Sequence, residues 1–410
     1  DCKQKWLTCD MVELHRTGTP STPGAGELLQ ILRDGGARTK AELAAYTGLA
    51  RSTVAGRIDV LLAAGLASPA GEAASTGGRP PARVAFNPRA GIVLAIDLGA
   101  THATIAIVDL AHQILDSHAT PLDIAAGPET VLNLVLAEGA TLMARGKHDV
   151  STLLGVGIGV PGPVEYSTGR PTNPPIMPGW DRFDVPGYVQ RALPVPVFVD
   201  NDVNVLALGE HALSWPDVDD LIFVKVSTGI GAGIISGGAL QRGAQGSAGD
   251  MGHVLVPYGH DSPRTPGGER DLEAVASGRA LAASLTAAGL AASGSQDVVD
   301  LVRGGNPAAI AATRQAGREV GEVLATVVNM LNPSMIVLGG SISRAGEHLL
   351  AGVREVVYRR SIPLATQHLA IVQSMAGTTA GVLGAALMVT QRVLDPSNID
   401  ALAATLTPRT

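Results

Sequence analysis

GIVLAIDLGATHATIAIVD, residues 91–109, places a small polar turn between two apolar runs. The runs Ile92–Ile96 and Ala103–Val108 predict two buried strands. The turn contains a carboxylate, a glycine and a hydroxyl, at Asp97, Gly99 and Thr101. Backbone amides and a hydroxyl at such a turn can bind phosphate, and the carboxylate can hold Mg²⁺ through water. The stretch therefore predicts a hairpin with a phosphate-binding turn inside an α/β domain.

A similar arrangement recurs farther along the chain. Leu221–Val226 predicts a strand, and residues 227–233, STGIGAG, form a Gly-rich turn that leads into another strand. Two such turns facing each other across a cleft would hold a nucleotide's phosphates from two lobes. One turn alone is more often an ordinary glycine-rich hairpin, so the repetition carries the prediction. Thr228 and Gly229 are the candidate phosphate contacts of this second turn.

A carboxylate follows the next predicted strand. Val197–Val199 leads into residues 200–202, DND, after which a helix is expected over Val203–His211. Asp202 therefore lies at the C-terminal end of a strand, where α/β enzymes place working residues. It can act as a general base towards a hydroxyl or cap the following helix, and both roles remain open.

Further polar side chains accompany Asp202. Asp250 and His253 lie three residues apart in the segment GDMGH, and Glu273 is expected on a helix over about Leu272–Ala283. Another predicted strand ends in the rigid loop PGP at residues 161–163. The set proposed for sugar hydroxyls is Gly162, Asn201, Asp202, Asp250, His253 and Glu273. Taken singly, each polar side chain is at least as often a solvated surface residue.

The N-terminal part predicts a helix-turn-helix. Helices are expected over Glu27–Asp34, Thr39–Gly48 and about Arg51–Ala64. Thr39 and Glu42 form a capping-box pattern at the start of the second helix. A short turn with glycine then leads into the third helix, as a helix-turn-helix requires.

Exposed side chains of this module suit DNA. The outer face of the third helix can reach phosphates or base edges in the major groove. Residues 66–69 and 83–86 predict a two-stranded wing whose tip carries Arg79, suited to a narrow minor groove. A helical bundle, or a winged module used for protein contact, is the alternative. The candidate DNA contacts are Thr39, Lys40, Arg51, Ser52, Thr53, Arg57 and Arg79.

Charge and composition agree with this division. Residues 1–90 carry 11 Lys or Arg against 8 Asp or Glu, whereas the whole chain of 410 residues has a net charge of −7. A basic module on an acidic body suits nucleic-acid contact at one end. The two cysteines, Cys2 and Cys9, lie outside the expected domains, which excludes a disulfide framework there. No apolar run is long enough to span a bilayer, and no signal peptide is recognised, so we expect a cytoplasmic protein.

In family order, these motifs resemble the ROK family of repressors, open reading frames and sugar kinases. The resemblance covers about residues 26–395 and includes Leu338-Gly339-Gly340. It implies a two-lobed actin/hexokinase-like (ribonuclease H-like) fold behind a winged helix-turn-helix. It also implies that the set from Gly162 to Glu273 holds a sugar and that Asp202 is the catalytic base of a kinase. The residues implied to approach a nucleotide are Asp97, Gly99, Thr101, Thr228, Gly229, Gly339 and Gly340.

The sequence departs from the family pattern at several positions. The family's zinc cluster uses three cysteines, and Arg264, Pro266 and Asp271 occupy those positions. We therefore expect no zinc or other metal site, and His253 is left free to face the sugar or go unused. Asp250 replaces a Glu, Ala100 a glycine and His102 a lysine. Asp250 loses one methylene of reach, while Ala100 and His102 alter the phosphate turn. With the missing cysteines, the altered turn favours regulation over phosphorylation.

The resulting expectation is a sugar-responsive transcriptional regulator, most simply a repressor of carbohydrate-related genes. Its expected partners are double-stranded operator DNA, a small sugar effector and further copies of itself in a homodimer or homotetramer. It requires no cofactor and no membrane, and it lies with the bacterial nucleoid. The alternatives are an ATP- and Mg²⁺-dependent sugar kinase that keeps a DNA-binding module, and a regulator that has lost ligand control.

We expect five regions. Residues 1–22 form a disordered or extraneous leader, and 23–88 the winged helix-turn-helix. The first lobe comprises 89–200 with 380–395, and the second lobe comprises 201–379. Residues 396–410 are expected to be a C-terminal tail.

Overall fold

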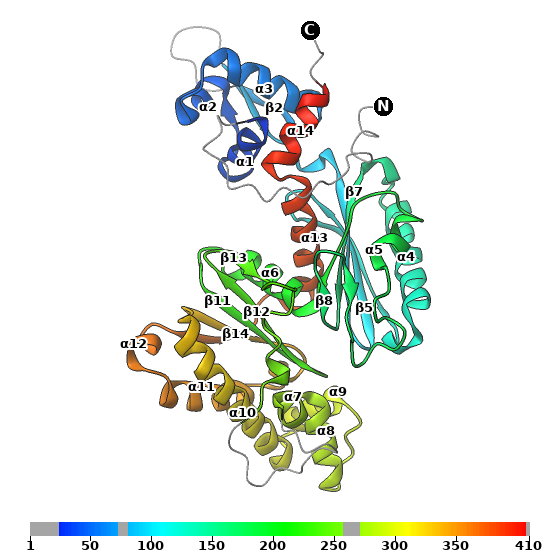
Figure 1. Ribbon diagram of the computed structural model, residues 1–410, viewed down its shortest axis with the longest axis vertical. Coiled ribbons are helices and arrows are strands. Elements are labelled where there is room, and N and C mark those ends of the chain that lie inside the picture. The colour runs from blue at the N-terminus through cyan, green and yellow to red at the C-terminus, as the bar shows by residue number, and fades with distance from the viewer. Residues whose placement is uncertain (1–23, 73–80, 257–270, 407–410) are drawn as a thin grey trace.

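The computed structural model describes residues 24–72, 81–256 and 271–406. These residues form a helical module at one end of an elongated molecule and two lobes below it (Figure 1). Each lobe is built on a five-stranded sheet, and a long helix, α13, lies between the lobes. In the described part of the chain no helix is long and apolar enough to cross a membrane.

The module contains the three expected helices and a three-stranded sheet of order β1-β3-β2. The capping box is confirmed, because Thr39 Oγ1 accepts the Glu42 amide and Glu42 Oε2 accepts the Thr39 amide, at 3.1 and 2.6 Å. The wing tip, residues 73–80 with Arg79, lies outside the described residues. The elements are α1 Ala25–Gly35, β1 Arg38–Thr39, α2 Lys40–Thr47, α3 Arg51–Ala63, β2 Ala67–Glu72 and β3 Ala82–Phe86.

The first lobe has the sheet order β10-β7-β4-β5-β6. Side chains alternate along β4, so that Val93 and Ala95 face α13 while Ile92, Leu94 and Ile96 pack with α4. The elements are β4 Ile92–Leu98, β5 His102–Asp109, β6 Ile114–Pro121, α4 Pro128–Arg145, β7 Leu153–Val160, β8 Val164–Glu165, β9 Arg170–Pro171, α5 Val185–Gln190 and β10 Val197–Asn201.

The second lobe has the sheet order β13-β12-β11-β14-β15. Its elements are α6 Asp202–Ser214, β11 Leu221–Val226, β12 Ile230–Ser236, β13 Ala239–Gln241, α7 Leu272–Ala276, α8 Gly278–Ala287, α9 Ser295–Arg303, α10 Pro307–Leu331, β14 Met335–Gly339, α11 His348–Arg360, α12 Pro363–Thr366 and β15 Ala370–Gln373. The single helix expected over 272–283 is wrong. Ser277 is extended, with ψ 160°, and caps α8, so the chain breaks there into α7 and α8.

The two sheets have the same topology. In each, the first three strands are antiparallel and two further strands add in parallel beside the first one. Strand β4 of the first lobe thus corresponds to β11 of the second. Both central strands enter a tight turn and return as the next strand, which gives the two facing turns their shared geometry.

Helix α13, Ala380–Val393, packs against both lobes. A Cβ at Gly384 would overlap the carbonyl oxygen of Val205, and one at Gly209 would overlap that of Ala380. The absence of side chains at these two glycines lets α13 and α6 cross with their backbones in contact. On its other side α13 covers β4 and β7 of the first lobe. The helix is therefore the axis that joins the lobes.

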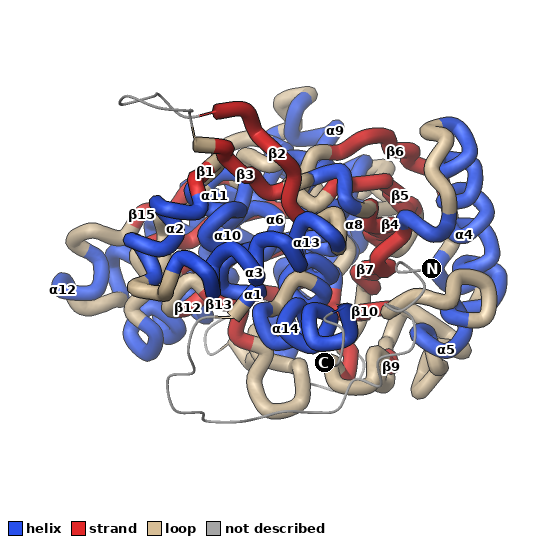
Figure 2. Tube along the Cα trace, turned by 90° about the horizontal axis from the view of Figure 1, so that it is seen from above, coloured by secondary structure: helices blue, strands red, loops and turns tan. Residues whose placement is uncertain are grey.

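The C-terminal segment is a helix packed on the module, where a tail was expected. Helix α14, Pro396–Leu406, lies against α1 and α3 (Figures 1 and 2). Asp400 Oδ1 accepts the Gly26 amide at 2.9 Å, and Gln30 Nε2 donates to the Leu394 carbonyl at 2.7 Å. Ile399 and Leu402 join one continuous core with the module and with α13. This core links the module to the first lobe.

Candidate functional site

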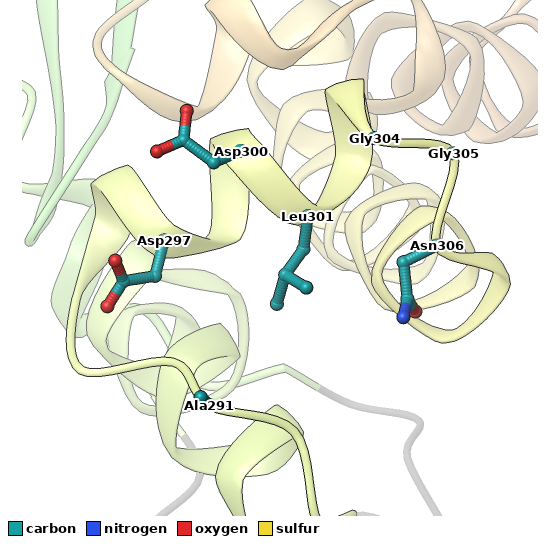
Figure 3. A pocket seen from close by; sticks show the side chains of 7 residues that line it. All are labelled: Ala291, Asp297, Asp300, Leu301, Gly304, Gly305 and Asn306. Carbon is teal, nitrogen blue, oxygen red and sulfur yellow. The ribbon is translucent and has the colours of Figure 1, made fainter.

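Two hollows lie away from the inter-lobe region. One, of about 480 Å³, lies beside α9 in the second lobe (Figure 3) and includes Asp297 and Asp300 in its lining. Asp297 already accepts hydrogen bonds from the Ser293 amide and hydroxyl, and Asp300 accepts one from Gln296. These carboxylates serve the local turn and helix. The hollow contains none of the predicted site residues.

The predicted phosphate turns connect equivalent strands of the two lobes. Asp97 lies one residue before the end of β4, and Lys225 lies one residue before the end of β11. Asp97 pairs with Thr104 on the returning strand and with Gly159 on the parallel strand. Lys225 pairs in the same way with Gly231 and Gly339. The two lobes thus present opposite charges at one equivalent position.

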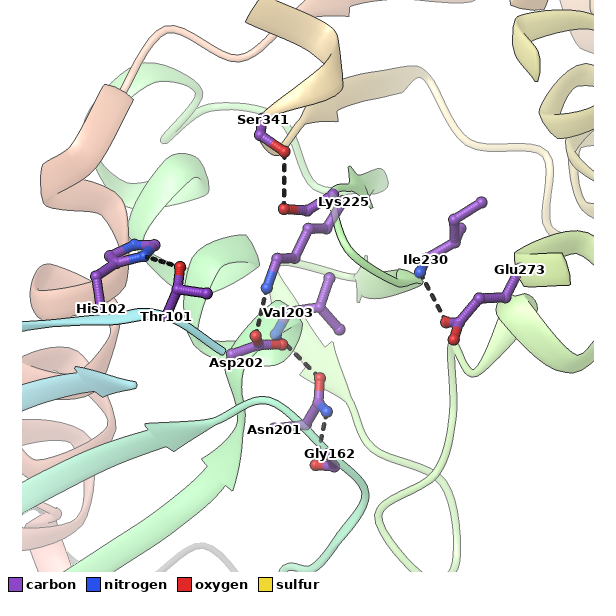
Figure 4. A network of polar contacts seen from close by, with 11 residues as sticks. Thr101, His102, Gly162, Asn201, Asp202, Val203, Lys225, Ile230, Glu273 and Ser341 are labelled. Atoms are coloured by element: carbon purple, nitrogen blue, oxygen red, sulfur yellow. Dashed lines mark hydrogen bonds and ion pairs between the residues drawn. The ribbon is translucent and has the colours of Figure 1, made fainter. Parts of the chain in front are cut away.

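Lys225 forms an ion pair with Asp202 (Figure 4). Its Nζ donates to Asp202 Oδ2, and the Asp202 side chain is only 8% exposed. Asp202 lies on the first turn of α6, at the junction between strand and helix that was predicted. The cap of α6 is Asn201, whose Oδ1 accepts the Val203 amide at 2.9 Å, so Asp202 is not the cap. The Asp202 carboxylate is committed to an ammonium group.

The charges around this pair shift one another. Burial, followed by repulsion from Asp202, raises the pKa of Asp97 to about 6, although Lys225 opposes the change. Burial acts to lower the pKa of Lys225, but attraction to Asp202 and Asp97 outweighs it and raises that pKa. Burial, with repulsion from Lys225 and Arg344, lowers the pKa of His102. Lys225 is therefore a charged ammonium close to two carboxyl groups.

Asn201 ties this junction to the first lobe. Its Nδ2 donates to the Gly162 carbonyl at 2.8 Å, so two residues predicted for the sugar site are in direct contact (Figure 4). Asn201 directly precedes Asp202 in the chain, and the structure thus brings together half of the predicted sugar-binding set.

The rest of that set lies around the second turn. Glu273 Oε2 accepts the Ile230 amide at 3.0 Å (Figure 4), and its Oε1 lies 3.4 Å from Arg279 Nη2. Asp250 is exposed. His253 is also exposed, with Nδ1 3.4 Å from Asp271 Oδ2. Glu273 thus braces the turn, while His253 faces the one candidate zinc position that the structure describes, since residues 264 and 266 are outside the described ranges.

The nucleotide candidates keep close backbone geometry. Gly340 has φ +89°, and a Cβ there would overlap the Val226 carbonyl. Ser341, which follows it, has its Oγ 2.9 Å from Ser227 Oγ (Figure 4). The Gly339-Gly340 turn therefore lies directly beside the Thr228-Gly229 turn. Gly99 and Thr101 belong to the facing turn, where Thr101 is exposed and the Gly99 amide donates to the His102 carbonyl.

Sequence reasoning missed three charged residues, of which Glu210 and Asp200 are buried and Lys225 is partly buried. Glu210 of α6 is fully buried and accepts hydrogen bonds from the Trp215 ring, the Ser374 hydroxyl and the amides of Met375 and Ala376. These bonds fix the loop that enters α13. Lys225 was detectable, because it is the one charged residue in the apolar strand LIFVKV and such residues are rarely buried without a partner.

Asp200 is the third missed residue. It is fully buried and pairs with Arg242 at 2.6 Å, which joins the first lobe to the second. The Arg242 guanidinium also lies 3.9 Å from the ring centre of Tyr166. Nothing in the local sequence indicated this pair, because its partners are 42 residues apart.

The candidate DNA contacts occupy different environments. Arg51 and Ser52 are exposed at the start of α3. Lys40 is exposed but pairs with Asp59 of α3 at 2.7 Å. Thr39 is buried, with 5% exposure, and its hydroxyl serves the capping box. The structure therefore assigns Thr39 to holding α2 in place.

Thr53 and Arg57 lie on the flank of α3 beside α14. They line a hollow of about 540 Å³ with Asp400 and Ala404. The Arg57 Nη1 atom is buried without a hydrogen-bond partner among the described residues. Helix α14 thus borders the side of α3 that carries these two candidates.

Comparisons with known proteins fit this architecture. The model of the ROK family matches residues 93–392. The xylose repressor of Bacillus spizizenii is 29% identical over 359 residues, which cover 87% of this chain and 92% of that protein. The glucokinase of Halalkalibacterium halodurans is 28% identical over 316 residues, covering 72% of this chain and 94% of the kinase. The repressor thus matches a larger share of this chain than the kinase does.

A solved structure extends the likeness over both parts. It is a ROK family transcriptional regulator described as a homologue of the E. coli MLC protein. Its TM-score is 0.78 at 24% identity, and the match covers 93% of this chain and 98% of that one. At this identity the comparison establishes the shared fold.

Proposed function

Because the chain belongs to the ROK family, we propose that it is a sugar-responsive transcriptional repressor. The observation that carries this function is the match to the xylose repressor over 87% of the chain, well beyond the residues that the kinase relative covers. The capped helix-turn-helix, with its exposed recognition-helix start, supplies the DNA-binding part. The lobes supply the part that binds the effector.

We assign DNA contact first to Arg51 and Ser52, whose side chains are exposed at the start of α3. The start of a recognition helix contacts base edges in the major groove in helix-turn-helix proteins. Lys40 and Arg57 are assigned to phosphate contact, and binding there has to open the Lys40–Asp59 pair. Thr53 and Arg79 complete the proposed set of DNA contacts. Thr39 supports them by holding α2 in place through the capping box.

The proposed effector is a sugar of the xylose type, held between the lobes. Asn201 and Asp202 lie where the strand β10 ends, and Asp250, His253 and Glu273 approach from the second turn. Hydroxyl groups suit amide and carboxylate partners of this kind. The protein is further proposed to act as a homodimer or homotetramer in the cytoplasm, on operator DNA, without a cofactor.

The structure offers a route from sugar to DNA. Helix α13 crosses α6, the helix that begins at Asp202, at Gly384 and Gly209. It continues into α14, which packs on α1 and α3 of the module. A sugar that favours one lobe arrangement shifts α13, and the shift reaches the recognition helix.

Fluorescence anisotropy on DNA upstream of the chain's own gene and of neighbouring carbohydrate genes tests the function. We expect specific binding at physiological salt that xylose or another pentose or hexose changes at least about tenfold. Arg51→Ala should abolish the preference over random DNA, whereas the exposed Lys147→Ala, in the body, should leave it intact. If no fragment outcompetes random DNA, the proposal is wrong.

A further inference from the structure

We infer that Lys225 is a resident cation that makes the polar site around Asp202 a binding site without a magnesium nucleotide. The inference rests on the proposed function only for the identity of the ligand. The ammonium group of Lys225 pairs with Asp202, the carboxylate that a sugar kinase would use as its base. This pairing neutralises the negative charge that would hold a metal ion.

The first step is geometric. Lys225 Nζ donates directly to Asp202 Oδ2, and the two side chains are 22% and 8% exposed. A carboxylate held by an ammonium is a poorer base, because protonation has to break the ion pair. The pair therefore opposes abstraction of a proton from a sugar hydroxyl.

The second step concerns the metal. The carboxyl groups of Asp97 and Asp202 both attract the Lys225 ammonium, and they also repel each other. Two carboxylates with open coordination are typical ligands for Mg²⁺ or Mn²⁺. A fixed ammonium among them supplies positive charge already and repels an approaching dication. The residues present therefore do not fit a magnesium nucleotide.

The third step is the duplicated topology. Asp97 and Lys225 occupy equivalent strand positions, each paired to glycine on the parallel neighbour, Gly159 and Gly339. The two opposite charges attract each other between the lobes. Lys225 thus favours closure by itself, a role that bridging metal ions have in phosphoryl-transfer sites.

Removing the ammonium tests the inference. The full chain is titrated with MnCl₂, and free Mn²⁺ is followed by electron paramagnetic resonance. Lys225→Met keeps the length of the side chain and removes its charge, so it should bind Mn²⁺ at least about tenfold more tightly than the wild type. Lys225→Arg keeps a charge and should resemble the wild type. Lys147→Met, at an exposed lysine, is the matched control and should also resemble it.

A second change identifies the site. Adding Asp202→Asn to Lys225→Met should abolish the gained Mn²⁺ affinity, and circular dichroism checks that each variant remains folded. Equal Mn²⁺ binding by wild type and Lys225→Met, or a gain that survives Asp202→Asn, would overturn the inference. Binding of operator DNA by the wild type is measured separately. If the wild type does not bind operator DNA, the proposed repressor function is contradicted, while the Mn²⁺ result still stands.

Discussion

The two lobes share a sheet topology and differ in what they place at the same position. The first carries Asp97 at the end of its central strand, and the second carries Lys225. Lys225 pairs with the Asp202 carboxylate, whereas Asp97 is a second carboxyl group beside that pair. Two strands of equivalent topology therefore carry opposite charges just before their turns.

The joint between the lobes gives the largest expected effect. Gly384→Ala places a methyl group on the Val205 carbonyl, where two backbones leave no room. We expect a loss of about 3 kcal/mol or more in the free energy of unfolding, measured by urea denaturation. Gly56→Ala in α3 is the matched control, because no atom lies within 4 Å of the new methyl. It should stabilise by up to about 1 kcal/mol. Equal behaviour of the two variants would contradict the close crossing.

Glu210 holds the second lobe to the joint through the loop that enters α13, whereas the first lobe contacts α13 through His112 and Thr390. Glu210→Ala leaves the donors of Ser374, Met375 and Ala376 without their acceptor. A loss of about 3 kcal/mol in unfolding free energy is expected, because each buried unpaired donor costs about 1 kcal/mol or more. Glu210→Gln retains one acceptor oxygen and should lose less. A harmless Glu210→Ala would show that water replaces the carboxylate.

The charge difference between the lobes should make the free energy of unfolding depend on pH. Burial and Asp202 raise the pKa of Asp97 from 3.8 to about 6 in the folded chain. Between these values the unfolded chain has lost the proton and the folded chain has kept it, so stability falls as the pH rises. Asp97→Asn removes this fall and should gain up to about 3 kcal/mol over the wild type above pH 6. Parallel stability curves for the two proteins, from acid to neutral pH, would refute the assignment.

His112, in the first lobe, gives folding stability a pH dependence of the opposite sign. Burial, then repulsion from Arg33, lowers its pKa from 6.5 to about 4, and its Nε2 lies 2.8 Å from Thr390 Oγ1 of α13. Between those values the unfolded chain binds the proton and the folded chain does not, so stability falls as the pH drops. His112→Gln should be the less acid-sensitive protein, by up to about 3 kcal/mol near pH 4. Unfolding of both proteins in urea across this range measures the difference. An unchanged acid transition in His112→Gln would contradict this origin.

Local patterns predicted much of this fold. The capping box at Thr39 and Glu42 was readable because its partners are three residues apart. The strand hairpins around Asp97 and Thr228 followed from apolar runs broken by small residues.

Long-range contacts account for what the sequence left open. Lys225 and Asp202 lie 23 residues apart, and Asp200 and Arg242 lie 42 apart, so no local signal joined them. Residues 396–406 were expected to belong to a C-terminal tail, because the core that buries Ile399 and Leu402 is formed with α1 and α3, far away in the sequence. The break at Ser277 depends on capping geometry that competes with helix propensity. Of the sugar candidates, Asn201 contacts Gly162 and precedes Asp202, while Glu273 bonds to the turn backbone; their contact with a sugar stays a prediction.

The packing of α14 on α1 also sets an order of events during synthesis. Gln30 leaves the ribosome 364 residues before Leu394, the partner of its side chain. Until that partner arrives, the apolar face of α1 lacks the cover that Ile399 and Leu402 provide. The DNA-binding module is therefore completed only after both lobes have been translated. A chain cut short before α14 carries a recognition helix on an unfinished core, so the cell gains a repressor head only together with the body that controls it.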